Sequence, residues 1–219
     1  MSTRSRTPFV IAAVLVVIAV AAVLAIVLTR SSDDDNGASP TTTSPTTGGG
    51  GEDIVYGTVT VEGEPLPEYE GDPDPAVGMT PPTLIGQSYD GTPLEIVPGE
   101  GGPMMVVFLA HWCPHCNAEV PVLMEWRDSG DIPEELQIFG VSTAVTDTRP
   151  NFPPSEWLAD AGWDWPTLAD DEQITAFQAY GGPSFPYFVV IGADGTVKAR
   201  NRGELPIEAL NELVQTALA

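Results

Sequence analysis

Residues 104–116, MMVVFLAHWCPHC, decide the fold of this chain. The first six form an unbroken apolar run, which is typical of a β-strand buried on both faces of a sheet. Directly after it, the spacing of apolar residues predicts a helix from Cys113 to about Arg127, whose buried side carries Val120, Leu123, Met124 and Trp126. The motif Cys113-Pro114-His115-Cys116 therefore lies where a buried strand ends and a helix begins, a place where sites collect in α/β proteins.

Outward from this motif, strands and helices alternate. Further strands are predicted at 54–61, 83–86, 93–96, 136–142, 187–191 and 196–200, and further helices at 156–161, 170–180 and 208–218. Asp90-Gly91 and Asp194-Gly195 predict hairpin turns, and Ser155 is the expected cap of the helix that follows it. Residues 62–82, rich in Pro, Glu and Asp, are expected to be an irregular lead-in. The pattern predicts a mixed central sheet with helices on both sides.

The N-terminal region predicts a membrane anchor and a linker. Residues 9–28 carry no polar side chain and would span roughly 30 Å as a helix, enough to cross a bilayer. Arg4 and Arg6 precede this span, so residues 1–8 are expected in the cytoplasm and the rest on the far side. The alternative is a cleaved signal peptide, although Ala19-Val20-Ala21 fits a cleavage site only inside the apolar run. Residues 31–51 (SSDDDNGASPTTTSPTTGGGG) are expected to form a disordered linker.

The charge of the chain is strongly negative and unevenly placed. The formal net charge is −23, and the charges before Glu52 cancel, so the whole excess lies on residues 52–219. Five bases stand there: Arg127, Arg149, Lys198, Arg200 and Arg202. Such a surface repels phosphate backbones, so nucleic acid is not an expected partner. The acidity serves either solubility and tolerance of salt or the binding of a cationic partner.

The two cysteines of the chain, Cys113 and Cys116, are the candidate catalytic residues. A purely structural disulfide across so short a loop would add little stability, which favours a redox pair. A sulfur at a helix N-terminus faces unpaired N–H groups and the positive end of the helix dipole, so the Cys113 thiolate is favoured and Cys116 becomes the resolving thiol. Pro114 suits the first helical turn. His115 either stabilises the thiolate or is an ordinary turn residue, and His111 either touches the site or points to solvent.

These residues resemble the active site of the thioredoxin family, with Trp112 just before the first cysteine. The continuation NAEVPVL (117–123) is similar to the membrane-tethered TlpA/ResA branch, whose pattern is W-C-x-x-C-x-x-E-x-P. The segments WPTLAD (165–170), AYGG (179–182) and SFP (184–186) continue the likeness, which covers about residues 76–219. It implies a thioredoxin fold of class α/β over 76–219, with a core of four or five strands and an added N-terminal hairpin. Residues 52–75, before this domain, are expected to be an extracytoplasmic lead-in. The only redox group it implies is the disulfide between the two cysteines, with no added cofactor or metal.

The resemblance also implies roles for individual residues. Pro186 is expected in the cis form, in a loop with Phe185 that binds client backbone beside Cys113, with Trp112 and Pro114 completing the substrate-binding surface. The alternatives are a trans loop proline at 186 and mere packing for the tryptophan. Glu119 is expected to tune or deprotonate the buried thiol, or else to be a solvated helix residue. Thioredoxin carries a buried Asp where this chain has Val107.

The leading hypothesis is an enzyme on the extracytoplasmic face of a prokaryotic cell membrane that exchanges disulfides with secreted or membrane client proteins. A membrane redox partner would recharge it, and a haem-attachment CxxCH segment would be a natural client in cytochrome c maturation. The scaffold is typical of reductases, whereas Pro114-His115 is typical of the oxidising DsbA proteins, so the direction stays open. The alternative is copper binding by Cys113, Cys116, His115 and His111, although the spacing is CxxC and the chain has no third histidine.

Overall fold

The computed structural model describes residues 54–218. The predicted cytoplasmic segment 1–8, the apolar span 9–28 and the linker 31–51 lie outside these residues. Within 54–218, none of the helices combines the length and the apolar character that crossing a bilayer requires.

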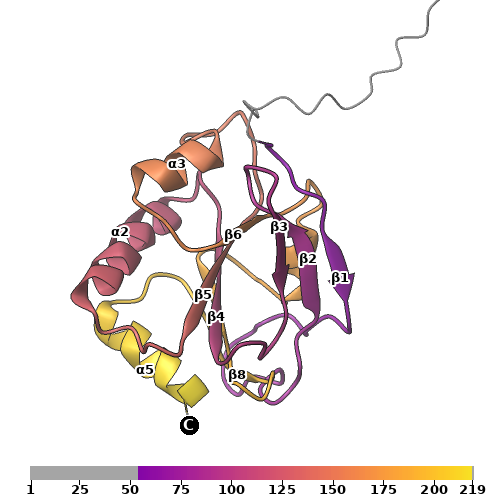
Figure 1. Cartoon of the computed structure of the whole chain (residues 1–219), viewed down its shortest axis with the longest axis vertical. Coiled ribbons are helices and arrows are strands. Elements are labelled where there is room, and N and C mark those ends of the chain that lie inside the picture. Colours follow the sequence, from indigo (N-terminus) through magenta and orange to yellow (C-terminus); the bar gives the residue numbers. More distant parts are fainter. Residues whose placement is uncertain (1–53, 219) are drawn as a thin grey trace, which may run out of the picture. The chain divides into compact units, whose positions relative to one another are not determined.

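A five-stranded mixed sheet forms the centre of the fold (Figure 1), in the order β6-β5-β4-β7-β8. The strands are β4 (Met104–Leu109), β5 (Gln137–Ser142), β6 (Thr167–Ala169), β7 (Tyr187–Ile191) and β8 (Val197–Arg202). The first three run parallel to one another, while β7 is antiparallel to both β4 and β8. This is the mixed sheet that the sequence predicts, and it is the core of a thioredoxin fold.

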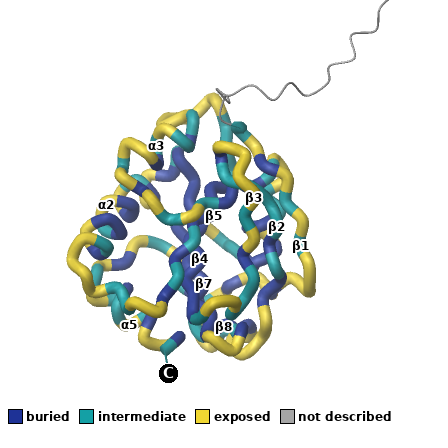
Figure 2. The backbone as a smooth tube through the Cα atoms, viewed as in Figure 1, coloured by how far each residue is buried: buried dark blue, intermediate teal, exposed yellow. Residues whose placement is uncertain are grey.

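Strand β4 shows why the sheet is buried on both faces, as Figure 2 displays in dark blue. Its alternate residues Met105, Val107 and Leu109 enter one apolar core, while Met104, Val106 and Phe108 enter the other. The first core lies against α2 (Pro114–Ser129), α3 (Pro154–Asp160) and α5 (Ile207–Leu218). An apolar residue at every position of the strand is thus required by the fold.

The second core is covered mainly by a small antiparallel sheet rather than by helices alone. It consists of β1 (Thr60–Glu62), β2 (Thr83–Gln87) and β3 (Pro93–Ile96), in the order β1-β2-β3, and the short helix α4 (Thr175–Ala179) packs on the same side. The β2-β3 hairpin is the predicted N-terminal extension, with Gly91 at positive φ in its turn. Helices thus lie on both sides of the central sheet, as expected, and on this side α4 shares the cover with the small sheet.

The lead-in to this sheet is irregular in backbone but firmly packed. Leu66, Tyr69 and Ala76 are buried in the second core, and the backbone N–H of Leu66 donates to the Ala179 carbonyl. Residues 54–59, predicted as strand, are not strand, because only Thr60–Glu62 pairs with β2. The backbone of the segment after β1 is thus irregular, but its apolar side chains are part of the second core.

Two helix predictions need correction. Ser155 does not cap α3, because the helix begins at Pro154 and its N-cap residue is Pro153. The Ser155 hydroxyl is buried and has no hydrogen-bond partner among the described residues. The helix predicted at 170–180 shortens to α4, because the Asp170 carboxylate accepts the backbone N–H groups of Ala176 and Phe177 and holds the preceding residues in a turn. Apart from β1, already described, and β6, which the sequence does not predict, the remaining helices and strands lie within a few residues of their predicted bounds.

Candidate active site

The CxxC motif opens helix α2. Cys113 is the N-cap residue in extended conformation, Pro114 stands in the first turn, and no side chain caps the helix. That first turn contains no acidic residue, so no carboxylate competes with a Cys113 thiolate for the free N–H groups. No bond joins the two sulfurs in the structure. The predicted position of the motif, at the end of β4 and the start of a helix, is confirmed.

The two sulfurs differ in their surroundings. Cys113 keeps 7% of its surface exposed, and its thiol donates to the Phe185 carbonyl at 3.7 Å. Cys116 is fully buried, and its sulfur accepts the backbone N–H of Ala110 at 3.4 Å. Burial raises the pKa of Cys116, and the negative charge of Glu119 acts in the same direction. The outer sulfur can therefore meet another protein, while the inner one can meet only Cys113.

The loop at Phe185–Pro186 lies directly beside Cys113. The peptide bond between these two residues is cis, as the resemblance implies. The Phe185 ring packs edge-on against the Trp112 ring, with 6.2 Å between ring centroids, and at a tilt against the Phe177 ring, with 4.4 Å between centroids. The indole N–H of Trp112 donates to the Ala144 carbonyl at 2.7 Å. The half-buried rings of Trp112 and Phe185, supported by the buried Phe177, thus lie beside Cys113.

Glu119 is completely buried one turn after Cys116 on α2, so the alternative of a solvated helix residue is wrong. One carboxylate oxygen accepts the backbone N–H of Leu205 at 2.9 Å, and the other has no partner among the described residues. Burial raises the pKa of Glu119 to about 7. Val107, in the same core, supplies no acid of its own, so Glu119 is the carboxyl group of this core that can exchange a proton near neutral pH.

His115 lies at the surface and its ring is already engaged. Its Nδ1 is 2.6 Å from a carboxylate oxygen of Glu204, in the connection between β8 and α5. Among residues 54–218, no hydrogen bond joins His115 to either sulfur. The histidine of the motif therefore faces a carboxylate, which the CPHC sequence does not reveal.

His111 is neither at solvent nor bonded to a sulfur. It is fully buried, its Nε2 accepts the backbone N–H of Thr146, and its Nδ1 therefore carries the proton that it donates to the Pro150 carbonyl at 2.7 Å. Burial lowers the pKa of His111, which keeps the ring neutral. The described residues contain no group of three or more His, Cys, Asp or Glu side chains placed to hold a metal ion, so the copper alternative gains no support.

Asn117 connects the motif to its surroundings, and sequence reasoning did not single it out. Its amide N–H groups donate to the carbonyls of His111 and Cys113, and its oxygen accepts from the side chains of Asn151 and Trp157. Three separate segments, namely the motif, the loop after β5 and helix α3, meet at this one amide. Its place directly after the second cysteine is the only signal that the sequence offers.

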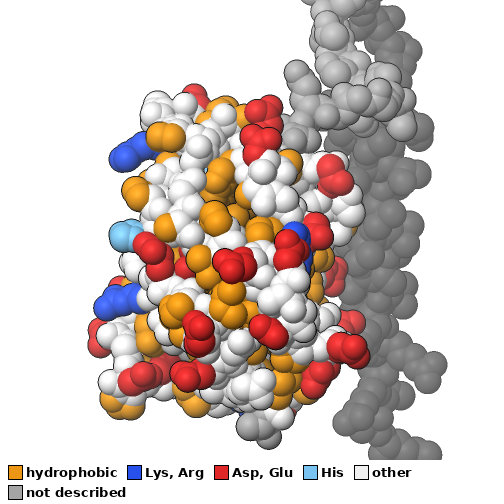
Figure 3. Space-filling view, turned by 90° about the vertical axis from the view of Figure 1, so that its left-hand side faces the viewer, with side chains coloured by type: hydrophobic (Ala, Val, Ile, Leu, Met, Phe, Trp, Pro, Cys, Tyr) orange, Lys and Arg blue, Asp and Glu red, His pale blue; other side chains and the backbone are white. Residues whose placement is uncertain are grey.

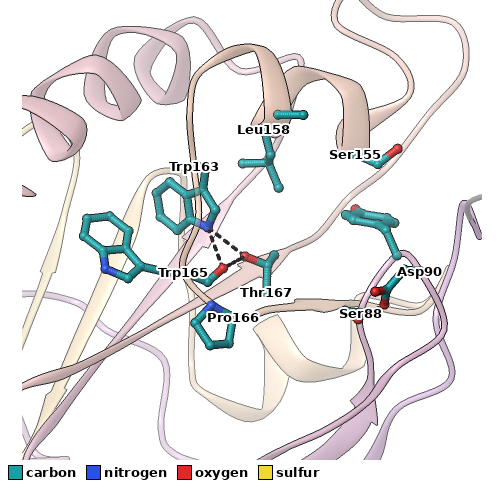
Figure 4. A pocket seen from close by; sticks show the side chains of 10 residues that line it. Ser88, Asp90, Ser155, Leu158, Trp163, Trp165, Pro166 and Thr167 are labelled. Atoms are coloured by element: carbon teal, nitrogen blue, oxygen red, sulfur yellow. Dashed lines mark hydrogen bonds between the residues drawn. The ribbon is translucent and has the colours of Figure 1, made fainter.

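A pocket of about 330 Å³ lies apart from the sulfurs, between the β2-β3 turn, α3 and the segment before β6 (Figure 4). Trp163, Trp165 and Pro166 form one wall, and the Trp163 indole N–H donates to Thr167 and to the Trp165 carbonyl. None of the candidate redox residues lines it. The segment Trp165–Asp170, which carried part of the family resemblance, thus shapes this pocket and forms β6.

A CxxC pair at the N-terminus of a helix, on this mixed sheet and beside a cis-proline loop, defines the class of thioredoxin-like thiol–disulfide oxidoreductases. The chain belongs to the Redoxin family, whose model matches residues 64–216. It is 27% identical over 129 residues to the soluble secreted antigen MPT53 of Mycobacterium tuberculosis, a match that covers 56% of this chain and 64% of that protein. Less than two thirds of the relative is therefore matched.

Solved structures share the fold. A thiol:disulfide interchange protein of Chlorobium tepidum aligns with a TM-score of 0.54 and 24% identity, over 65% of this chain and 97% of that one. A secreted disulfide oxidoreductase of Mycobacterium tuberculosis, homologous to DsbE of E. coli, aligns with a TM-score of 0.51 and 22% identity, over 60% and 93%. At these identities the likeness shows the thioredoxin fold.

Proposed function

We propose that this chain is an extracytoplasmic thiol–disulfide oxidoreductase that exchanges disulfides with secreted or membrane client proteins through Cys113 and Cys116. The observation that carries this proposal is the unequal placement of the two sulfurs. Cys113, at the start of α2 and beside the Phe185 carbonyl, is largely buried but keeps 7% of its surface exposed, whereas Cys116 has no exposed surface. Exchange through a mixed disulfide needs one sulfur that reaches the client and one that does not.

In the oxidising direction, a client thiolate attacks the Cys113 sulfur of the disulfide form. The bond between the two enzyme sulfurs breaks, and Cys116 leaves as a thiolate that takes up a proton. A second client thiol loses its proton and attacks the client sulfur of the mixed disulfide, so that a client disulfide forms and Cys113 leaves. Two electrons pass to the enzyme, and the reduced product has the two free thiols that the structure contains.

In the reducing direction the same steps run backwards, and Cys116 must lose its proton before it can resolve the mixed disulfide. Burial raises the pKa of Cys116, so this proton needs a nearby acceptor. Glu119 stands one turn away with a pKa raised to about 7, which is the range in which a carboxylate both accepts and returns a proton near neutrality. We assign Glu119 this role.

The client would lie along the loop at Phe185–Pro186. The rings of Trp112 and Phe185, which pack against each other, offer half-buried apolar surface beside Cys113. Pro186 has no backbone N–H to donate and its carbonyl accepts from Gly203, so a client segment would pair with neighbouring backbone of the loop rather than with this residue. Pro114, exposed in the first turn, completes the surface.

The proposed location outside the cytoplasm rests on the sequence. The apolar span 9–28 with Arg4 and Arg6 before it favours a single-pass anchor with the domain on the outer face, and a membrane redox partner would recharge the cysteines there. The match to MPT53, described as secreted, supports an extracytoplasmic setting. Client proteins would be those with thiols or disulfides, including a CxxCH segment if the enzyme works as a reductant.

Trapping of mixed disulfides tests the proposal. In Cys116→Ser, an intermediate with the client on Cys113 has no resolving thiol and accumulates as a covalent adduct in membranes, where mass spectrometry identifies the client. Cys113→Ser is the matched control, because it removes the outer sulfur and keeps the buried one. Adducts in the first variant and none in the second are expected. Equal adduct levels in both variants, or none in either under oxidising and reducing conditions, would refute the proposed exchange.

A further inference from the structure

Three successive residues in the connection between β8 and α5 contact three different parts of the candidate active site. The Gly203 N–H donates to the Pro186 carbonyl at 2.9 Å, and the Leu205 N–H donates to Glu119 at 2.9 Å. Between them, the Glu204 carboxylate lies 2.6 Å from the Nδ1 of His115. We call residues 203–205 the connector. Since its backbone is fixed at both ends, the position of Glu204 is fixed as well.

Glu204 is the one partner found for the imidazole of His115 within the described residues. The His115 side chain is 67% exposed and the Glu204 side chain 49%, so the pair contributes little to stability and a change at Glu204 leaves the fold intact. Glu204 instead affects the ionisation of the Cys113 thiol through His115. A cation next to Cys113 stabilises the Cys113 thiolate. When the His115 ring is bonded to the Glu204 carboxylate, however, the negative carboxylate largely cancels the effect of a positive ring on that thiolate.

We propose that Glu204 is a positioning residue: it holds the His115 imidazole out of hydrogen-bonding contact with Cys113 and thereby moderates the oxidising power of the Cys113–Cys116 disulfide. This rests on the proposed function, because it concerns the same pair of sulfurs. It also explains how a CPHC motif, which by itself favours an oxidant, can stand on a scaffold typical of reductants. The connector, together with the Pro114-His115 dipeptide, sets the oxidising power of the disulfide.

The direction of the effect follows from charge. In Glu204→Gln, the imidazole loses its charged partner and keeps at most a weaker, neutral hydrogen bond to the amide oxygen, so the ring can turn toward the outer sulfur more readily. A negative charge also disappears from the neighbourhood of the site. Both changes stabilise the thiolate and therefore the reduced enzyme, which makes the disulfide a stronger oxidant. In Glu204→Asp the charge stays, but the shorter side chain no longer reaches the ring. A positioning role predicts the same direction for both variants.

The test is the redox equilibrium of the full-length chain with glutathione, followed by the fraction of enzyme thiols at equilibrium. Glu204→Gln is expected to shift the equilibrium constant toward reduced enzyme by roughly three- to tenfold, where tenfold corresponds to about 30 mV for this two-electron couple. In a His115→Ala background the shift should fall below half of that size on a logarithmic scale. Glu208→Gln, which removes an exposed charge on α5 without a bond to His115, is the control.

No shift in Glu204→Gln, a shift toward oxidised enzyme, an equal shift in Glu208→Gln, or half or more of the shift remaining without His115 would overturn the inference. A Glu204→Asp variant that behaves like the wild type would overturn it too, since charge alone would then explain the Gln result. Failure of the proposed function is distinct: in that case the wild-type chain itself forms no disulfide in glutathione buffers. If the wild type exchanges with glutathione and Glu204→Gln has the same equilibrium constant, only the proposed role of Glu204 is refuted.

Discussion

At the scale of single residues, Glu119 shows how the fold converts an ordinary helix residue into a chemical group. Its neighbour on the same helix, Glu125, is exposed, whereas Glu119 is fully buried with one oxygen unpartnered within the described chain. Burial raises the pKa of Glu119 from 4.5 to about 7. The folded chain therefore holds a proton between these pH values that the unfolded chain has lost.

This difference predicts a pH dependence of stability. Because the folded state binds the extra proton, the free energy of unfolding falls as pH rises from about 4.5 to 7. In Glu119→Gln this fall should be smaller by about 2 kcal/mol, since a neutral amide has no proton to lose. Urea unfolding of the reduced domain at several pH values measures it. Glu125→Gln should follow the wild-type curve, and a Glu119→Gln curve parallel to the wild type would contradict the assignment.

The histidines illustrate what a motif can and cannot reveal. The sequence places His111 and His115 beside the sulfurs, and both are indeed close in the chain to Cys113. What it cannot give is the partner of each ring, because Pro150 and Thr146 for His111 and Glu204 for His115 come from segments 35 to 89 residues away. Long-range partners of this kind depend on the packing of loops, for which a single sequence carries no periodic signal.

At the scale of elements, a buried ion pair fastens the lead-in to the sheet. Arg200 on β8 donates to both carboxylate oxygens of Asp74, and its guanidinium also donates to the carbonyls of Pro67 and Tyr180. Both side chains are essentially without exposed surface. Asp74, which lies in the predicted irregular lead-in, is thus part of the protein interior. Arg200 stabilises this packing and has no exposed side-chain surface with which to bind a client.

Loss of this pair should destabilise the domain strongly. Asp74→Asn leaves the Arg200 guanidinium buried without a counter-charge, which we expect to cost about 3 kcal/mol in the free energy of unfolding. Asp194→Asn is the matched control, because it breaks the exposed pair with Lys198 in the β7-β8 turn and should change little. Chemical denaturation of the two variants measures the difference. Equal effects would show that burial of the Asp74 pair does not matter.

Most elements follow from the sequence because their pattern is strong. The runs at β4, β5 and β7 are apolar, and the Asp-Gly turns at 90–91 and 194–195 predict both hairpins. Strand β6 escapes prediction because its three residues have no pattern of their own and become a strand only by pairing with β5. Helix α4 is shorter than its predicted range because Asp170, fully buried, captures N–H groups at its start.

At the scale of the whole molecule, the dominant feature is charge. The chain carries a formal net charge of −23, and Figure 3 shows acidic side chains spread over one face of the domain with few basic ones among them. Of the five described bases, Arg127, Lys198 and Arg200 form salt bridges with acidic residues. The remaining carboxylates repel one another across the surface, which opposes compaction.

Salt should therefore stabilise the domain. At 0.5 M NaCl the screening length is shorter than most distances between surface charges, so we expect the free energy of unfolding to rise by about 1 kcal/mol relative to 10 mM NaCl at pH 7. Urea, which carries no charge, is the suitable denaturant, and KCl should act as NaCl does. A stability that stays constant or falls with added salt would show that local ion pairs outweigh the general repulsion.

The central claim is that Cys113 and Cys116 form one two-electron redox couple. The most direct measurement is the number of free thiols on the wild-type domain across a series of glutathione redox buffers, with the oxidised product identified by mass. The account predicts a single transition in which both thiols disappear together and the product is two hydrogens lighter, without bound glutathione. Thiols that stay free in every buffer, or a stable glutathione adduct on one cysteine, would contradict it.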